Sequence, residues 1–148
     1  MVGDIVENFT LKDQDGNDFN LYKNLDKNIL LVFYPKDNTP VCNAQLSDYN
    51  LNQETFEQHN IRIIGINAAE VSEHKSYCDH KGFSFSILSD SDKAVSTHYD
   101  ALNLFEQNKR KLVLIGTDKK IIYEKSGFSF LYLNSVQIIK SLKSLKII

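Results

Sequence analysis

Residues 29–42 read ILLVFYPKDNTPVC and carry the clearest structural signal in the chain. The first six of these residues are an uninterrupted apolar run rich in β-formers, which predicts a strand that is covered on both faces. Pro35 and Pro40 then bound a short loop. Pro40 suits the first position of a helix, because the N–H that proline lacks has no helical partner there. The segment therefore predicts a buried strand, a tight loop and a helix that begins at Pro40.

Outside this segment the chain alternates between strand and helix patterns. The expected strands are 29–34, 61–66, 83–88, 111–115 and 120–125. The expected helices run from 40 to about 58, over 72–80 with Gly82 as C-cap, over 90–99, and from 134 to about 146 with Asn134 or Ser135 as N-cap. Residues 9–11 and 18–20 flank a turn signal and predict an N-terminal hairpin. This order predicts an α/β domain with helices on both faces of a central mixed sheet, whose last two strands are antiparallel.

Composition and charge limit the possible functions. The chain has 148 residues, a mass of 17.0 kDa and a formal net charge of −2. This balance argues against a nucleic-acid binder and against a polybasic membrane anchor, and the longest apolar run is far shorter than the roughly 20 residues that span a bilayer. Because two cysteines cannot build a disulfide scaffold and no secretory leader is evident, we expect the reducing cytoplasm.

Cys42 is the candidate nucleophile of the first segment. It falls in the first turn of the expected helix, where unpaired N–H groups and the positive end of the helix dipole favour a thiolate. Thr39 stands at the expected N-cap, where its hydroxyl can accept from a backbone N–H. The alternative is that Cys42 is a small buried apolar residue, as free cysteines usually are. The helix-start position and the proline-braced loop favour the reactive interpretation.

The pattern Pro35-x-x-x-Thr39-x-x-Cys42 is similar to the P-x-x-x-T-x-x-C signature of peroxiredoxins. Residues 33–40 resemble the bacterioferritin-comigratory-protein (PrxQ) branch of that family, and shorter matches extend the resemblance over most of the chain. The resemblance implies a thioredoxin-like fold with an N-terminal β-hairpin extension, as a single AhpC/TSA-type domain over 1–148. It also implies a thiol-dependent peroxidase for hydrogen peroxide and organic hydroperoxides, which acts as a monomer and without a metal or organic cofactor.

The same resemblance implies roles for individual residues. Cys42 would be the peroxidatic cysteine, Thr39 would hydrogen-bond the peroxide, and Pro35 would shield the thiolate. The arginine that the family supplies from a distant loop aligns with Arg110, which would stabilise the thiolate and the charge developing on the peroxide. The chain has two arginines against fifteen lysines, and only arginine offers a fixed pair of donors. The plain alternative is that Arg110 is a solvated surface residue.

Cys78 lies 36 residues after Cys42. Many PrxQ-like proteins place a resolving cysteine five residues after the peroxidatic one, where this chain has Ser47, but another group places it on a later helix at about this separation. The resemblance therefore implies that Cys78 resolves Cys42 as an intramolecular disulfide, which thioredoxin or a similar dithiol reduces. Because cysteines on separate helices seldom satisfy disulfide geometry, we expect local unwinding on oxidation. Gln45 is a second departure, since related sequences often have Glu there as an anionic partner for Arg110.

Other interpretations stay open. If Cys78 is only a buried helix residue, the chain is a one-cysteine peroxiredoxin that an external thiol resolves. A general thiol–disulfide oxidoreductase is disfavoured, because no Cys-x-x-Cys occurs and no proline follows Pro40. A metal-binding module would use His74 and Cys78, four residues apart on an expected helix. Four aromatic residues either form an apolar wall for organic hydroperoxides or, as we favour, pack in the core or a loop; they are Phe83, Phe85, Phe128 and Phe130.

Overall fold

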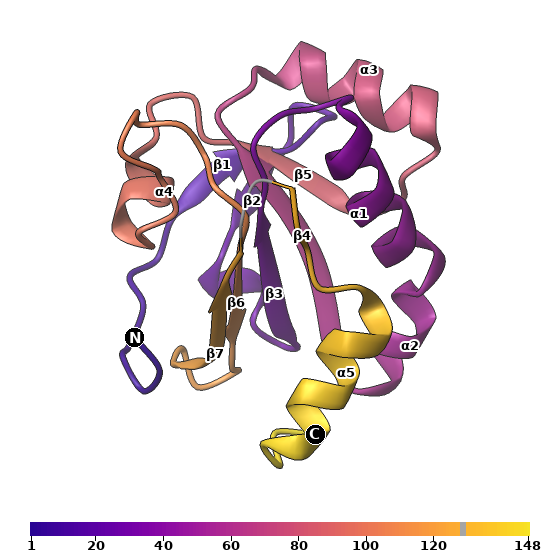
Figure 1. Ribbon diagram of the computed structural model, residues 1–148. Helices are drawn as coiled ribbons and strands as arrows, with labels where there is room; N and C mark the ends of the chain where they lie inside the picture. The colour runs from indigo at the N-terminus through magenta and orange to yellow at the C-terminus, as the bar shows by residue number, and fades with distance from the viewer. Residues whose placement is uncertain (128–129) are drawn as a thin grey trace.

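The computed structural model describes residues 1–127 and 130–148 (Figure 1). Its elements follow in this order along the chain: β1 (Thr10–Lys12), β2 (Asp18–Asn20), a 3₁₀ turn (Tyr22–Asn24), β3 (Asn28–Phe33), α1 (Pro40–Leu51), α2 (Gln53–Gln58), β4 (Ile61–Asn67), α3 (Val71–Lys81), β5 (Ser86–Ser89), α4 (Ala94–His98), β6 (Lys111–Ile115), β7 (Ile121–Ser126) and α5 (Ser135–Ser144). No helix of the described residues combines the length and apolar character that crossing a membrane requires.

The strands of the described residues form one sheet in the order β2-β1-β5-β4-β3-β6-β7. β3 is parallel to β4, and β4 is parallel to β5. β6 is antiparallel to β3, and β7 is antiparallel to β6. β1 and β2 form an antiparallel hairpin, which joins the sheet where Lys12 pairs with Ser89. The predicted mixed sheet, its antiparallel edge and the N-terminal hairpin are confirmed.

Helices cover both faces of this sheet. Side chains from α1, α2, α3 and α5 pack on one face against Leu30 and Val32 of β3. The segments around α4 and the N-terminal hairpin cover the other face, where Leu31 and Phe33 point. Figure 1 shows α1, α2 and α5 on the side of the sheet opposite α4. Because every one of these β3 side chains is fully buried, each stabilises the fold by roughly 1.5–3 kcal/mol, and the carboxyl end of β3 is a rigid support for the loop that follows.

The helix predicted from residue 40 to about 58 is wrong as one element, because it breaks at Asn52 between α1 and α2. The backbone of Asn52 is not helical (φ −109°, ψ 16°). Its side-chain amide donates to the carbonyl oxygen of Asp48 over 2.8 Å. Asparagine side chains compete in this way with the helical hydrogen bonds of the backbone, so that they favour helix ends.

Two further predicted elements begin later than expected. The helix predicted over 90–99 is the short α4, because Lys93 adopts a left-handed conformation (φ 61°) just before it. The Asp90 carboxylate lies outside the helix and accepts from the backbone N–H groups of Val95 and Ser96. The strand predicted over 83–88 is β5, which begins at Ser86. The predicted ends of two other helices are confirmed by Gly82, which is left-handed after α3, and by Asn134, which caps α5.

Candidate active site

Cys42 lies in the first turn of α1, beyond the loop that follows the carboxyl end of β3. Pro40 occupies the start of the helix and Thr39 is its N-cap, as predicted from the sequence. Cys42 is fully buried. As the third residue of α1, it belongs to the turn whose backbone N–H groups have no helical partner. There the helix dipole stabilises an anion by roughly 0.3–1 kcal/mol.

The Thr39 hydroxyl does not cap α1, and that part of the expectation is wrong. Its Oγ1 donates to the carbonyl oxygen of Lys36 over 3.1 Å, and no side-chain hydrogen bond to the helix start forms. The loop turns at Asn38, which is left-handed (φ 55°), between these two residues. Because a hydroxyl that donates its proton can still accept, Thr39 offers an acceptor oxygen close to the start of α1. Pro35 is half-buried at the beginning of the same loop.

Arg110 is distant from Cys42 in the sequence but contacts it in the fold. It immediately precedes β6, whose residue Lys111 pairs with Phe33 at the end of β3. This register places the arginine beside the loop that leads to α1. Its Nη1 donates to Cys42 Sγ over 3.2 Å, and its side chain is buried, with 4% of the residue exposed. The fold thus brings the predicted arginine to the predicted cysteine, and a solvated surface Arg110 is excluded.

Gln45 completes the contact between Arg110 and α1. Its Oε1 accepts from Arg110 Nη1 over 2.7 Å, and its Nε2 donates to the hydroxyl of Tyr49, which in turn donates to the carbonyl oxygen of Leu133. The sequence has Gln45 where related sequences often have Glu. In the structure the neutral amide oxygen of Gln45 accepts the hydrogen bond from Arg110 in place of a carboxylate. Burial raises the pKa of Tyr49 above its ordinary value, so this hydroxyl keeps its proton for the chain of hydrogen bonds. The sequence offered no signal for Tyr49 or Leu133.

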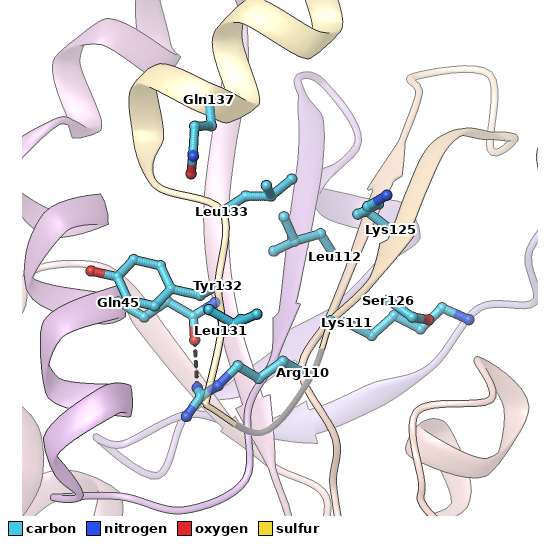
Figure 2. Close-up of a pocket in the computed structure, with 11 residues that line it drawn as sticks. Gln45, Arg110, Lys111, Leu112, Lys125, Ser126, Leu131, Tyr132, Leu133 and Gln137 are labelled. Atoms are coloured by element: carbon cyan, nitrogen blue, oxygen red, sulfur yellow. Dashed lines mark hydrogen bonds between the residues drawn. The ribbon is translucent and has the colours of Figure 1, made fainter.

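A cavity of about 350 Å³ adjoins Arg110 and Gln45 (Figure 2). It lies between β6, β7 and the segment before α5, and its apolar lining includes Leu112, Leu131 and Leu133. Figure 2 shows the Arg110 side chain extending toward Gln45, with the hydrogen bond between them marked. The cavity therefore offers an apolar volume next to the guanidinium.

The aromatic wall considered from the sequence does not form from the described residues. Phe83 and Phe85 are buried, and their rings stack with centroids 5.3 Å apart. Phe130 is 67% exposed, and Phe128 lies outside the described residues. Packing in the core is confirmed for Phe83 and Phe85.

Cys78 lies on α3, which packs on the same face of the sheet as α1. It is buried, with 5% exposed, and both cysteines are free thiols in this structure. Next to it, Tyr77 donates to the side-chain oxygen of Asn43 on α1 over 2.7 Å, so the two helices that carry the cysteines are joined by a hydrogen bond. Burial, followed by the charge of Asp37, raises the pKa of the Cys78 thiol from 9.0 to about 12.

At pH 8 we expect iodoacetamide to modify Cys78 on the order of 10³-fold more slowly than an unperturbed thiol, because only the thiolate reacts. The raised pKa, about 12, also predicts that this rate grows tenfold with each pH unit through the alkaline range. Timed mass spectrometry of the peptide that contains Cys78 measures both quantities. Protein unfolded in guanidinium is the control, and equal rates in the folded and unfolded chains would contradict the prediction.

His74 takes part in a buried cluster of polar side chains rather than in a metal site. Its Nδ1 lies 2.6 Å from Asp37 Oδ2. Within residues 1–127 and 130–148, no group of three or more His, Cys, Asp or Glu side chains is arranged to hold a metal ion. Sequence reasoning missed Asp37, although it lies inside the motif. A buried acidic residue between two prolines, in the loop that follows a buried strand, is the arrangement that singles it out.

Comparisons with known proteins show the family to which the chain belongs. The AhpC/TSA family model matches residues 2–124. A putative peroxiredoxin bcp of Helicobacter pylori is 33% identical over 100 residues, which cover 68% of this chain and 66% of the relative. Chloroplastic peroxiredoxin Q of Triticum aestivum is 31% identical over 148 residues, covering 99% of this chain and 65% of the relative. The chain thus spans just under two thirds of the length of these curated relatives.

Solved structures give the same result for the fold. Peroxidoxin BcpB of Mycobacterium tuberculosis superposes with a TM-score of 0.84 at 25% identity, covering 99% of this chain and 97% of that one. A PrxQ mutant of Xylella fastidiosa superposes with a TM-score of 0.85 at 26% identity, covering 99% and 96%. The predicted thioredoxin-like fold is confirmed. From the family match, the relatives and the shared fold, it follows that this chain belongs to the AhpC/TSA family and is a peroxiredoxin of the Bcp and peroxiredoxin Q type.

Proposed function

We propose that residues 1–148 form one thioredoxin-like domain that reduces hydrogen peroxide and organic hydroperoxides with Cys42 as the attacking thiolate. The observation that carries the proposal is the contact between Arg110 Nη1 and Cys42 Sγ, 3.2 Å long, in the first turn of a helix. A buried guanidinium and unpaired backbone N–H groups both stabilise negative charge on this sulfur. Such stabilisation turns a buried cysteine, otherwise inert, into a nucleophile.

The proposed first step is attack of the Cys42 thiolate on one oxygen of the peroxide. An S–O bond forms, the O–O bond breaks, and water or an alcohol leaves after taking up a proton, so that Cys42 becomes a sulfenic acid. Arg110 stabilises the charge on the departing oxygen. The acceptor oxygen of Thr39 orients the peroxide, and Pro35 limits the access of water to the thiolate. The apolar cavity beside Arg110, about 350 Å³ in volume, offers room for the carbon chain of an organic hydroperoxide.

The proposed second step is attack by Cys78 on the sulfenic acid, which gives an intramolecular disulfide and releases water. Support comes from the placement of both cysteines on helices that cover one face of the sheet and are joined by the Tyr77–Asn43 hydrogen bond. We propose that this bond opens when the start of α1 or the end of α3 unwinds to bring the sulfurs together. Thioredoxin or a similar dithiol then reduces the disulfide by exchange. The proposed setting is the reducing cytoplasm, with the protein acting as a monomer.

The experiment that tests this scheme is non-reducing mass spectrometry after one equivalent of hydrogen peroxide. The expected product is a disulfide between Cys42 and Cys78, two hydrogens lighter than the reduced chain. If the product is instead a stable sulfenic acid at Cys42 that reacts only with added thiol, the one-cysteine alternative replaces the two-cysteine scheme. Insulin reduction without peroxide consumption would favour the general thiol–disulfide oxidoreductase.

A Cys78→Ser variant should turn over roughly tenfold more slowly with thioredoxin as the reductant, because the intramolecular thiol with its high effective concentration is lost. Stopped-flow tryptophan fluorescence of the thioredoxin partner, or coupled reductase activity, measures this loss. Dithiothreitol attacks a sulfenic acid directly and should support the variant much better than thioredoxin does. Equal activity of the variant and the parent with thioredoxin would contradict a resolving role for Cys78.

A further inference from the structure

Asp37 is the centre of a buried polar cluster that the proposed peroxide chemistry does not use. Its carboxylate accepts hydrogen bonds from the Tyr34 hydroxyl over 2.5 Å and from Asn67 Nδ2 over 3.1 Å, and its Oδ2 lies 2.6 Å from His74 Nδ1. All four side chains are at most 4% exposed. A carboxylate that already takes two donors acts as an acceptor toward its third partner as well.

These contacts decide which nitrogen of His74 carries the proton. Because Asp37 can only accept, Nδ1 is the donor, and the neutral imidazole therefore has its lone pair on Nε2. His74 is fully buried, and among the described residues Nε2 has no hydrogen-bond partner. A buried polar atom without a partner is uncommon and points to a function that the resting structure does not show. The arrangement of a carboxylate, an oriented imidazole and an open Nε2 is that of a general base.

Cys78 lies one helical turn beyond His74 on α3. Side chains four residues apart share one side of a helix, and here both are turned into the protein, since Cys78 is 5% exposed. The thiol must lose its proton before it can attack a sulfenic acid. Burial raises its pKa to about 12, so it is almost wholly protonated at neutral pH. In this environment the resolving cysteine needs a base.

We propose that His74 is the base that removes the thiol proton of Cys78 during disulfide formation, with Asp37 as the residue that positions its ring. The inference rests on the proposed function, since it concerns the second step of that scheme. The Cys78 proton moves to Nε2, the thiolate attacks Cys42 Sγ, the S–S bond forms and the S–O bond of the sulfenic acid breaks. The leaving hydroxide takes the proton from the imidazolium and departs as water, which returns His74 to its starting state.

The other titratable groups around Cys78 do not replace this base. Asp37 is occupied by its three donors, and Lys75 is a cation that pairs with Asp15 and Asp79 at the surface. Tyr34 and Tyr77 keep their protons, because burial raises the pKa of both hydroxyls above its ordinary value. The remaining charged neighbours are exposed carboxylates, which are weak bases. Of this set, His74 is the group that presents a nitrogen, Nε2, without a hydrogen-bond partner in the described part of the chain, on the same helix as Cys78.

The decisive variant is His74→Asn, measured in single turnover by stopped flow after one equivalent of hydrogen peroxide. The asparagine amide keeps an N–H donor where Nδ1 stood, facing Asp37, but it has no basic nitrogen. We expect the second phase, conversion of the Cys42 sulfenic acid to the disulfide, to slow by about 100-fold at pH 7. His80→Asn is the matched control, because His80 is exposed on the same helix, and its second phase should match that of the parent.

The pH dependence of the second phase separates a base from a merely structural histidine. In the parent, the rate should level off within the range pH 6 to 9, because a general base, and not hydroxide, accepts the Cys78 proton. In His74→Asn it should instead rise tenfold per pH unit toward the pKa of Cys78, about 12, so that the two proteins converge in alkali. A parent rate that climbs without a plateau from pH 6 to 9 overturns the proposal, and this measurement does not depend on the variant folding.

Failure of this inference is distinguishable from failure of the proposed function. If hydrogen peroxide produces no sulfenic acid at Cys42, as read by a dimedone adduct, or no Cys42–Cys78 disulfide in the parent, the proposed function fails. If both products form and His74→Asn shows the parent's second-phase rate and pH profile, only the role of His74 is overturned.

Discussion

A Cys42→Ser variant should consume peroxide no faster than the uncatalysed background, a loss on the order of 10⁵–10⁶-fold. Serine keeps the size and position of the side chain, but its hydroxyl is not ionised at neutral pH and does not attack an O–O bond. Arg110 and the start of α1 remain in place in the variant, so the loss reports the sulfur alone. Hydrogen peroxide consumption with a coupled dithiol reductant measures the effect.

Single turnover supplies the control for this prediction. One equivalent of hydrogen peroxide should be consumed by Cys78→Ser, which retains Cys42, and none by Cys42→Ser. Because Cys42 is fully buried in an apolar cluster, a hydroxyl at this site costs on the order of 1 kcal/mol of unfolding free energy, and thermal unfolding should confirm that the variant is folded. Retention of even 1% of the parent's peroxide consumption would refute Cys42 as the attacking residue.

Local sequence patterns were enough to predict the elements whose structure depends on neighbouring residues. The apolar run before Pro35 specified β3, Pro40 specified the start of α1, and the positions of Cys42 and Arg110 followed from a motif and a resemblance. That these two residues meet depends on the register between β3 and β6, which is set by packing over the whole sheet. The resemblance supplied this long-range information, and periodicity did not.

What the sequence could not provide was the direction in which polar side chains turn. Thr39 was expected to cap α1, yet its hydroxyl bonds within the loop. Gln45 stands where related sequences often have an anionic Glu, yet its amide oxygen accepts from Arg110. Asp37 and His74 are 37 residues apart and meet only after α3 has packed against the loop. Such contacts depend on backbone positions to within an ångström, whereas composition and spacing fix only which residues are near the same end of the sheet.

An Arg110→Ala variant should lose on the order of 10³-fold in kcat/KM for hydrogen peroxide, because one buried guanidinium contacts both Cys42 Sγ and Gln45 Oε1 and such preorganised charge is worth several kcal/mol in the transition state. Arg110→Lys should recover only part of this loss, since an ammonium restores the charge without the rigid, planar guanidinium whose Nη1 donates to both acceptors. Stopped-flow measurement of Cys42 oxidation determines both values.

Arg62→Ala is the matched control for the arginine prediction, because Arg62 is the second arginine of the chain and takes no part in the site. It donates to Asn24 and lies over the ring of Phe19, so its loss should lower stability without changing the rate at which Cys42 is oxidised. If Arg110→Ala and Arg62→Ala lose kcat/KM equally, Arg110 acts through the stability of the fold. If only Arg110→Ala loses kcat/KM and Arg110→Lys restores it fully, the positive charge alone accounts for the contribution of Arg110. The planar shape of the guanidinium then plays no part.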